Sequence, residues 1–245
     1  MPLSEFWHLL GGTTRILLAS FRRSNRFAPR LLFPGDPPEF PDPSKADAEG
    51  LLAIGGDLSP QRLLTAYRAG IFPWYNEDIP ILWWSPDPRG IIELDGLHVS
   101  RRLARTVRSG KFRIRHDTAF AEVMLGCADR PEGTWITADM FHAYCELHRL
   151  GYAHSVECWK DEQLAGGVYG VAIGGLFAAE SMFTRVTDAS KVALVHLVEH
   201  LRQRGYCLLD VQQVTPHTAS LGAVAIPRAD YLRRLQEAVS LPVTF

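Results

Sequence analysis

A carboxylate and an amide interrupt an apolar run that is predicted to be a β-strand. The run covers residues 206–214 and contains Asp210 and Gln212. The period of two in a strand places these side chains on one face, about 7 Å apart along the strand. A buried acid is costly unless it is paired, so this pair is a candidate site for proton transfer and substrate binding. The alternative is that both residues lie at a solvated strand end or serve a structural ion pair.

A second acid, Glu180, lies in the preceding predicted hairpin. Residues 163–171 and 176–183 are predicted strands on either side of Gly174-Gly175. Strand periodicity places Glu180 on one face with the apolar side chains of Leu176, Ala178 and Met182. The sequence therefore predicts a second candidate acid near the first, with the same structural alternative.

Tryptophans in two separate segments are candidates for contact with a nucleotide base. Trp74 lies in Phe72-Pro-Trp-Tyr and Trp135 in Gly133-Thr-Trp-Ile. An indole face stacked on a base contributes about 1–3 kcal/mol, although a tryptophan is more often a core residue. Trp83 and Trp84 lie in a predicted strand, where packing explains them.

One predicted helix carries a positively charged face. Ser100 is a suitable N-cap for a helix that ends near residue 109, and Leu103 and Val107 face the core side. The opposite face carries four arginines, Arg101, Arg102, Arg105 and Arg108. A solvated surface is one interpretation, but clustered arginines repel one another unless a polyanion neutralises them, so we favour contact with RNA phosphates.

We predict no metal site. The segment His196-Leu-Val-Glu-His200 fits an inverted zinc-peptidase pattern, in which two histidines and a glutamate share a helix. The apolar residues of this helix, however, place both histidines on the opposite, solvated face, and Glu237 is the only glutamate downstream to act as a third ligand. The glycines between residues 166 and 175 lack dinucleotide-binding spacing.

Composition indicates an ordinary globular protein of one large or two modest domains. The chain has 245 residues, 47% of them hydrophobic, and a formal net charge of -1. No apolar run approaches the roughly 18 residues needed to cross a bilayer. Four widely spaced cysteines indicate buried, reduced thiols, and with no recognisable signal peptide this favours the cytosol.

The elements that position these residues suggest an α+β architecture with a mixed sheet. The firmest prediction is a helix over 60–69, capped by Ser59 and closed by Gly70, and further helices are expected over 138–150, 190–204 and 229–239. We predict a basic N-terminal extension over 1–32, a small N-terminal α/β domain over 33–86, and a catalytic domain over 87–245.

Seven ordered motifs resemble the bacterial leucyl/phenylalanyl-tRNA-protein transferase family. The resemblance covers about residues 33 to 235. The motifs are Glu49-Gly-Leu-Leu-Ala-Ile-Gly-Gly-Asp-Leu, Gly70-Ile-Phe-Pro-Trp-Tyr, Leu82-Trp-Trp-Ser-Pro-Asp-Pro-Arg, Gly133-Thr-Trp-Ile, His154-Ser-Val-Glu, Glu180-Ser-Met-Phe and His217-Thr-Ala-Ser-Leu-Gly-Ala. Ala179 and Thr184 depart from the glycine and serine that are common in the family, which affects local backbone geometry only.

The resemblance implies a C-terminal domain with the fold of the GCN5-related N-acetyltransferases, in which aminoacyl-tRNA replaces acetyl-CoA. It also implies transfer of leucine, phenylalanine or, less well, methionine onto proteins that begin with arginine or lysine, which marks them for degradation by the N-end rule pathway. No cofactor and no membrane is implied.

The resemblance further assigns site residues. Asp210 and Gln212 would be catalytic with support from Glu180, and Trp74 and Trp135 would hold the terminal adenosine. The apolar amino-acid pocket would include Phe177, Met182 and Leu209. The arginine helix would contact the tRNA.

Ester aminolysis needs an unprotonated amine, and an N-terminal amine has a pKa near 7.7–8.0. Our hypothesis is that Asp210 takes this proton, Gln212 helps to hold the ester, and Glu180 orients the acceptor. A purely positional Asp210, with a tRNA hydroxyl relaying the proton, stays open. The rival functions are an acetyl-CoA-dependent N-acetyltransferase, a zinc peptidase and a non-catalytic tRNA-binding module.

Overall fold

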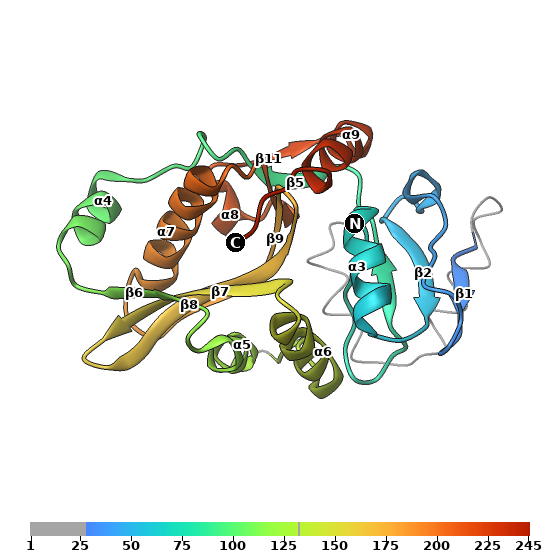
Figure 1. Cartoon of the computed structure of the whole chain (residues 1–245), viewed down its shortest axis with the longest axis horizontal. Helices are drawn as coiled ribbons and strands as arrows, with labels where there is room; N and C mark the ends of the chain where they lie inside the picture. Colours follow the sequence, from blue (N-terminus) through green and yellow to red (C-terminus); the bar gives the residue numbers. More distant parts are fainter. Residues whose placement is uncertain (1–27, 132) are drawn as a thin grey trace.

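Two β-sheets organise the residues that the computed structural model describes, 28–131 and 133–245 (Figure 1). The smaller sheet has four strands in the order β1-β2-β4-β3. These are β1 (Arg30–Leu32), β2 (Leu51–Gly55), β4 (Leu82–Trp84) and β3 (Phe72–Pro73). Strand β1 pairs in parallel with β2, so residues 30–32 belong to this sheet and not to the predicted extension. The rest of that predicted extension, residues 1–27, lies outside the described residues.

Helix α3 (Pro60–Arg68) packs on the smaller sheet and confirms the predicted helix. The Ser59 side chain accepts a hydrogen bond from the Arg62 backbone N–H, and Pro60 occupies the first turn, where its missing N–H costs nothing. Leu63 and Tyr67 are buried on its inner face, together with Trp83 of β4. The interpretation of Trp83 and Trp84 as core residues is correct, since both are buried.

The larger sheet is mixed, as predicted, with seven strands in the order β11-β5-β10-β9-β8-β7-β6. Only β10 and β9 run parallel, and every other neighbouring pair is antiparallel. The strands are β5 (Arg89–Ile92), β6 (Arg113–His116), β7 (Ala153–Lys160), β8 (Gln163–Ile173), β9 (Leu176–Thr184), β10 (Leu208–Gln212) and β11 (Ala223–Ile226). Strands β8 and β9 form the predicted hairpin.

Helices cover both faces of the larger sheet (Figure 1). One core cluster lies between the sheet and α7 (Ala189–Arg204), with α4 (Arg101–Arg108) at its margin. The other face packs α5 (Phe120–Ala128) and α6 (Ala138–Arg149), and its cluster continues into the smaller sheet. The remaining helices of the described residues are α8 (Pro216–Ala219), α9 (Arg228–Val239) and the 3-10 turn η1 (Pro43–Lys45). Because the two sheets share one core cluster, the division at residue 86 stays a prediction.

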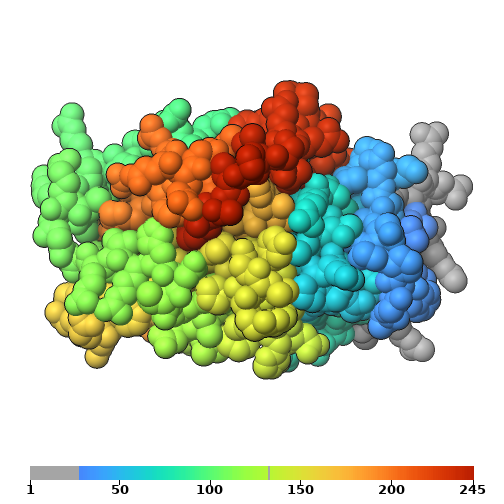
Figure 2. Space-filling model, viewed as in Figure 1, coloured from blue at the N-terminus to red at the C-terminus, as the bar shows by residue number. Residues whose placement is uncertain are grey.

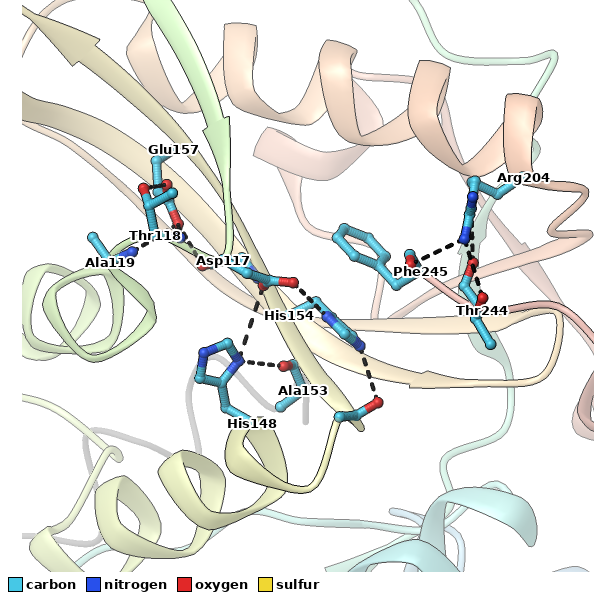
Figure 3. Close-up of polar contacts among 12 residues, drawn as sticks. Asp117, Thr118, Ala119, His148, Ala153, His154, Glu157, Arg204, Thr244 and Phe245 are labelled. Atoms are coloured by element: carbon cyan, nitrogen blue, oxygen red, sulfur yellow. Dashed lines mark hydrogen bonds and ion pairs between the residues drawn. The ribbon is translucent and has the colours of Figure 1, made fainter.

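A buried carboxylate fixes the start of α5. Glu157 on β7 is fully buried and accepts hydrogen bonds from the backbone N–H groups of Thr118 and Ala119, at 3.0 and 3.2 Å (Figure 3). Ala119 is the N-cap residue of α5 and makes no side-chain capping hydrogen bond. Glu157 therefore fixes the backbone that leads into α5 from a neighbouring strand.

Two further predictions concern exposure. Within residues 28–131 and 133–245, no helix combines the length and apolar character needed to span a membrane. All four cysteines are free. Cys127 and Cys158 are buried as predicted, but Cys145 is half-buried and Cys207, in the connection between α7 and β10, is exposed.

Candidate active site

A buried ion pair between Arg89 and Asp210 occupies the junction of the two sheets. The Arg89 Nε donates to Asp210 Oδ1 at 2.8 Å, and its Nη2 donates to Oδ2 at 2.6 Å. Both side chains are only 1% exposed. Two parallel hydrogen bonds in a site closed to water fix the orientation of both groups.

Further contacts satisfy the remaining hydrogen-bonding groups of Arg89 and Asp210. The Arg89 Nη1 donates to the Gly70 carbonyl at 2.9 Å, and the Tyr231 hydroxyl donates to Asp210 Oδ2 at 2.9 Å. The guanidinium also lies over the rings of Phe72 and Tyr231. Burial alone would lower the pKa of Arg89, but the adjacent Asp210 carboxylate outweighs burial and raises it. The guanidinium is thus permanently charged, and it joins the end of α3 to strands β5 and β10.

Gln212 follows Asp210 across an irregularity in β10. The pairing with β5 shifts between Asp210 and Gln212, and Gln212 adopts a left-handed backbone with φ 55°. Its backbone N–H donates to Asp210 Oδ1 at 2.9 Å. The predicted strand over 206–214 is therefore too long, and simple alternation does not orient Gln212. The Asp210 carboxylate holds this turn, because it accepts the Gln212 N–H.

Glu180 is the extra residue of a β-bulge in β9. Tyr169 pairs with Ser181 and Gly170 with Ala179, which leaves Glu180 without an opposite residue. The expectation that Glu180 shares a face with Met182 is wrong, because the bulge reverses the alternation after Glu180. Met182 packs in the cluster under α7, whereas Glu180 points to the opposite face.

Two tyrosines hold the Glu180 carboxylate. The Tyr67 hydroxyl of α3 donates to Oε1 at 2.8 Å, and the Tyr144 hydroxyl of α6 lies 3.4 Å from Oε2. The two hydroxyls also contact each other through a short hydrogen bond. The Gln212 side-chain amide reaches Oε1 at 3.5 Å. Glu180 of β9 thus contacts side chains of α3, of α6 and of Gln212 on β10.

Burial dominates the electrostatics of Glu180. Burial of the carboxyl end raises its pKa to about 8, and the Asp210 charge adds to this, while the Tyr67 hydrogen bond opposes it. The residue as a whole is half-buried. Burial also raises the pKa of Tyr67 and Tyr144 far above the usual value, so both hydroxyls stay protonated as donors. Glu180 is therefore a carboxyl group that can gain or lose a proton near neutral pH.

The parallel pairing of β10 with β9 ends beside these groups. It covers Leu208 to Asp210 on β10 and stops at Ala178 on β9. Glu180 and Gln212 lie just beyond the last pair. The two central strands therefore separate where the candidate catalytic side chains are placed.

The three predicted pocket residues, Phe177, Met182 and Leu209, fall in one core cluster between the sheet and α7. Phe177 and Leu209 are fully buried neighbours in the β9–β10 register, and Met182 is half-buried. Because side chains alternate along β10, Leu209 lies on the opposite face from Asp210. Apolar candidates and polar candidates thus occupy opposite faces beside the point where the strands separate.

Trp74 and Trp135 are both half-buried and pack against the cluster that joins the two sheets. Their segments are linked, because the hydroxyls of Tyr75 and Thr137 lie 3.3 Å apart. The Trp84 indole N–H donates to the Trp74 carbonyl. The structure therefore brings two tryptophans that are far apart in sequence into neighbouring segments.

The arginine face of α4 forms as predicted. Ser100 caps the helix, Leu103 is buried, and Val107 packs in the cluster under α7. All four arginines, Arg101, Arg102, Arg105 and Arg108, are exposed. Arg102 lies 3.9 Å from Asp188, whereas in the described part of the chain the other three have no acid within ion-pair distance. This leaves positive charge available for a polyanion.

The prediction that both histidines of the inverted peptidase pattern lie on a solvated face is wrong. His196 and His200 are half-buried, and His200 packs against the rings of His116 and Phe245. Among the described residues, no group of three or more potential ligand side chains is arranged to hold a metal ion.

Sequence reasoning missed Arg89, Tyr67, Tyr144 and Tyr231. Arg89 carried a usable signal, since a charged residue opens the apolar strand Arg89-Gly-Ile-Ile directly after a proline turn. The tyrosines carried none, because an aromatic residue on a buried helix face is the usual core pattern.

Two family models match this chain. The model described as leucyl/phenylalanyl-tRNA protein transferase matches residues 91–236, and a model of the N-terminal domain of that family matches residues 56–87.

Similar proteins carry the same description. A leucyl/phenylalanyl-tRNA–protein transferase of Anaeromyxobacter sp. (strain Fw109-5) is 57% identical over 207 residues, which cover 83% of this chain and 88% of the relative. One of Nitratidesulfovibrio vulgaris (strain DP4) is 54% identical over 215 residues, covering 86% and 92%. A solved GCN5-related N-acetyltransferase from Kribbella flavida aligns over 68% of this chain and 60% of that chain, with 12% identity and a TM-score of 0.33. The fold class stated above rests on the sheet order and not on this alignment.

The buried pair makes a prediction about stability. Arg89→Met leaves the Asp210 carboxylate buried and unpaired, so we expect the free energy of unfolding to fall by about 3–5 kcal/mol. Adding Asp210→Leu removes the orphaned charge and should recover part of this loss. Urea unfolding followed by circular dichroism measures both variants.

A matched control is available between α9 and the residue that follows β5. Arg234 makes an equally bidentate pair with Glu93, at 2.7 and 2.8 Å, but both groups are partly exposed. Arg234→Met should cost about 0–1 kcal/mol. Equal losses for the two arginine variants would show that burial of the Arg89 pair is not what matters.

The raised pKa of Glu180 predicts a pH dependence of stability. The usual value of 4.5 rises to about 8, so the folded protein keeps a proton that the unfolded chain releases. The stabilising contribution is present below the unfolded value and is lost as pH rises towards the folded value. Glu180→Gln cannot ionise, so its free energy of unfolding relative to the unsubstituted protein should increase between about pH 5 and pH 8. Glu122→Gln, at an exposed position of α5, should show no such trend.

Proposed function

The chain belongs to the leucyl/phenylalanyl-tRNA–protein transferase family and is an aminoacyltransferase that moves an amino acid from tRNA to a protein, and from this premise we propose its substrates and the roles of its residues. We propose that it transfers leucine, phenylalanine and, less efficiently, methionine to the N-terminal amine of proteins that begin with arginine or lysine. The product is marked for degradation by the N-end rule pathway in the cytoplasm.

One observation carries the assignment of the reaction centre. Glu180, Gln212 and the Arg89–Asp210 pair meet where β9 and β10 separate, with the predicted pocket residues on the other side of the sheet. An aminoacyl ester placed at this point has its carbonyl beside the polar groups and its side chain in the apolar cluster. Aminolysis of this ester needs no further activation, since the ester supplies the leaving group.

Asp210 has a positioning role in this proposal. Its oxygens already accept hydrogen bonds from Arg89, Tyr231 and the Gln212 backbone. A carboxylate that is occupied on both oxygens and closed to water is a poor proton acceptor for an incoming amine. Asp210 instead fixes the turn that presents the Gln212 amide, which holds the ester carbonyl.

Glu180 is the proton acceptor in this proposal. Its pKa of about 8 is matched to the pKa of an N-terminal amine, about 7.7–8.0, so proton transfer between the two is nearly balanced. The amine nitrogen bonds to the carbonyl carbon and loses one proton to the ionised Glu180 carboxylate. The bond from the carbonyl carbon to the ribose oxygen then breaks, and Glu180 passes that proton to the departing oxygen. The same carboxylate, once ionised, attracts the positive first side chain of the acceptor.

The tRNA is held at two places in this proposal. Trp74 and Trp135 stack on its terminal adenosine, and the exposed arginines of α4 contact phosphates of its body. Neighbouring tryptophan segments, and a helix face on which three arginines have no acid partner among residues 28–131 and 133–245, support this division.

The test is transfer of labelled leucine from leucyl-tRNA to short peptides. Peptides beginning with arginine or lysine should become one residue longer, and peptides beginning with alanine or glutamate should not. Labelled acetyl-CoA, offered separately, should label none of them. Equal transfer to all peptides would contradict the acceptor preference, and acetyl transfer would favour the acetyltransferase alternative.

Two variants test the proposed roles in this assay, one for each residue. Glu180→Gln should lower kcat by about 10²–10⁴-fold, the usual contribution of a general base, with little change in KM for leucyl-tRNA. Asp210→Ala should also lose transfer while tRNA binding is retained. Full transfer by Glu180→Gln would exclude Glu180 as the proton acceptor, and full transfer by Asp210→Ala would exclude its positioning role.

The arginine helix predicts a salt-dependent affinity for tRNA. Substituting glutamine at Arg101, Arg105 and Arg108 together should weaken tRNA binding and reduce the slope of log affinity against log salt by about 2–3, since each phosphate contact contributes about 0.7–0.9. Filter binding at several salt concentrations measures this slope. A control with glutamine at Arg149 and Arg233, exposed arginines that already pair with acids, should leave the slope unchanged.

A further inference from the structure

The final segment of the chain, residues 240–245, returns from α9 across the sheet to the end of α7. In Figure 2 it is the dark-red strip at the surface between orange α7 and the yellow residues below it. Arg204 of α7 donates to the Thr244 carbonyl at 2.9 Å and to its hydroxyl at 3.1 Å. Val243 packs in the cluster under α7. The segment is therefore anchored at several points, although it has no regular secondary structure.

The anchored segment places the Phe245 ring in a cage of aromatic side chains, of which Figure 3 shows His154. The ring stacks on His154 of β7, with centroids 4.4 Å apart and planes at 21°. His200 of α7 packs against it at 4.5 Å, and His116 of β6 lies at 5.9 Å. Phe245 thus joins two strands of the larger sheet to α7.

The wall of this cage is itself held by polar contacts. His154 Nδ1 lies 2.7 Å from Asp117 Oδ2, and its Nε2 lies 3.2 Å from the Gly151 carbonyl. The Ser155 backbone N–H holds the other Asp117 oxygen at 2.8 Å. Because both nitrogens of the imidazole have partners, the plane of the ring on which Phe245 stacks is fixed.

Phe245 also contacts Phe177, which belongs to the predicted amino-acid pocket. The two ring centroids are 5.6 Å apart. On its other side, Phe177 lies over Gly170, where an added Cβ would come within 2.5 Å of the ring. Phe177 is therefore confined between a strand that admits only glycine at this position and the Phe245 ring.

We propose that residues 240–245 form the far wall of the amino-acid pocket, and that Phe245, by confining Phe177, determines how large a side chain the pocket accepts. This inference rests on the proposed function, in which Phe177, Met182 and Leu209 line the pocket. The segment lies outside residues 91–236, the region that the transferase family model matches. The family resemblance therefore assigns it no role.

Packing physics gives the direction of the effect. Interiors are close-packed, so the space for a bound side chain depends on whether its neighbours can retreat. With Phe245 in place, Phe177 cannot move away from the sheet. With a smaller residue there, Phe177 can move into the vacated volume, and the pocket then favours phenylalanine over the smaller leucine.

The experiment compares transfer from phenylalanyl-tRNA and leucyl-tRNA to one arginine-initiated peptide. Phe245→Ala should raise the ratio of kcat/KM for phenylalanine over leucine by about 10-fold, the low end of what a methylene-sized change in an apolar pocket produces. Phe245→Leu should shift the ratio in the same direction by a smaller amount. The matched control is Phe33→Ala at a 64% exposed phenylalanine outside the pocket, which should leave the ratio unchanged.

The outcomes distinguish this inference from the function on which it rests. If the unsubstituted protein extends the peptide with neither amino acid, the proposed function fails. If it does so with both, and folded Phe245→Ala or Phe245→Leu leaves the ratio unchanged, the pocket-wall role is overturned. Loss of folding in both variants, seen by thermal melting, would equally overturn it, because the segment would then be a general part of the core.

Discussion

The buried pair of Arg89 and Asp210 is the constraint on which the arrangement of the site depends. Two charges can be closed off from water only if nearly every donor and acceptor has a partner, and here the partners come from distant segments: the Gly70 carbonyl after α3, the Tyr231 hydroxyl of α9 and the Gln212 backbone of β10. Each partner is needed to satisfy the pair, so the pair fixes the mutual position of these elements. A small displacement of α3 or α9 would leave a buried polar group unsatisfied. The site therefore inherits its geometry from an electrostatic requirement rather than from apolar packing alone.

Local strand irregularities then direct the candidate catalytic side chains. The bulge at Glu180 and the left-handed backbone at Gln212 both lie just past the last β9–β10 pair. A regular strand would have sent alternate residues to fixed faces and kept the strands paired. The two irregularities instead turn a carboxylate and an amide toward each other across the point of separation, where the Gln212 amide and Glu180 lie 3.5 Å apart. Bulges are common beside active sites for this reason.

The separation along the chain of the interacting residues decides which features of the fold and the site could be predicted from the sequence. Local signals predicted α3, α4 and the β8–β9 hairpin well, because caps, turns and periodicity act within a few residues. The same alternation rule failed at Met182, since a one-residue bulge leaves no signature in residue types. Partners such as Arg89 with Asp210, 121 positions apart, are decided by tertiary packing and cannot be read from spacing. The prediction that Asp210 and Glu180 belong to a site depended on their position in apolar strands. That position is visible in the sequence, whereas the residues that pair with them are not.

The sheet itself separates two kinds of chemistry, and this separation explains why so many elements meet at one point. Proton transfer benefits from groups with raised pKa, which burial against α3 and α6 supplies to Glu180. Recognition of an apolar side chain needs a dry, packed surface, which in the proposed function is the cluster under α7 on the other face. A single open pocket would have to meet both demands in one environment. Water in that pocket would weaken the binding of apolar groups and would lower the pKa of the acid. In the proposed function the parallel strands part between the two faces, so that one substrate is held in both environments at once.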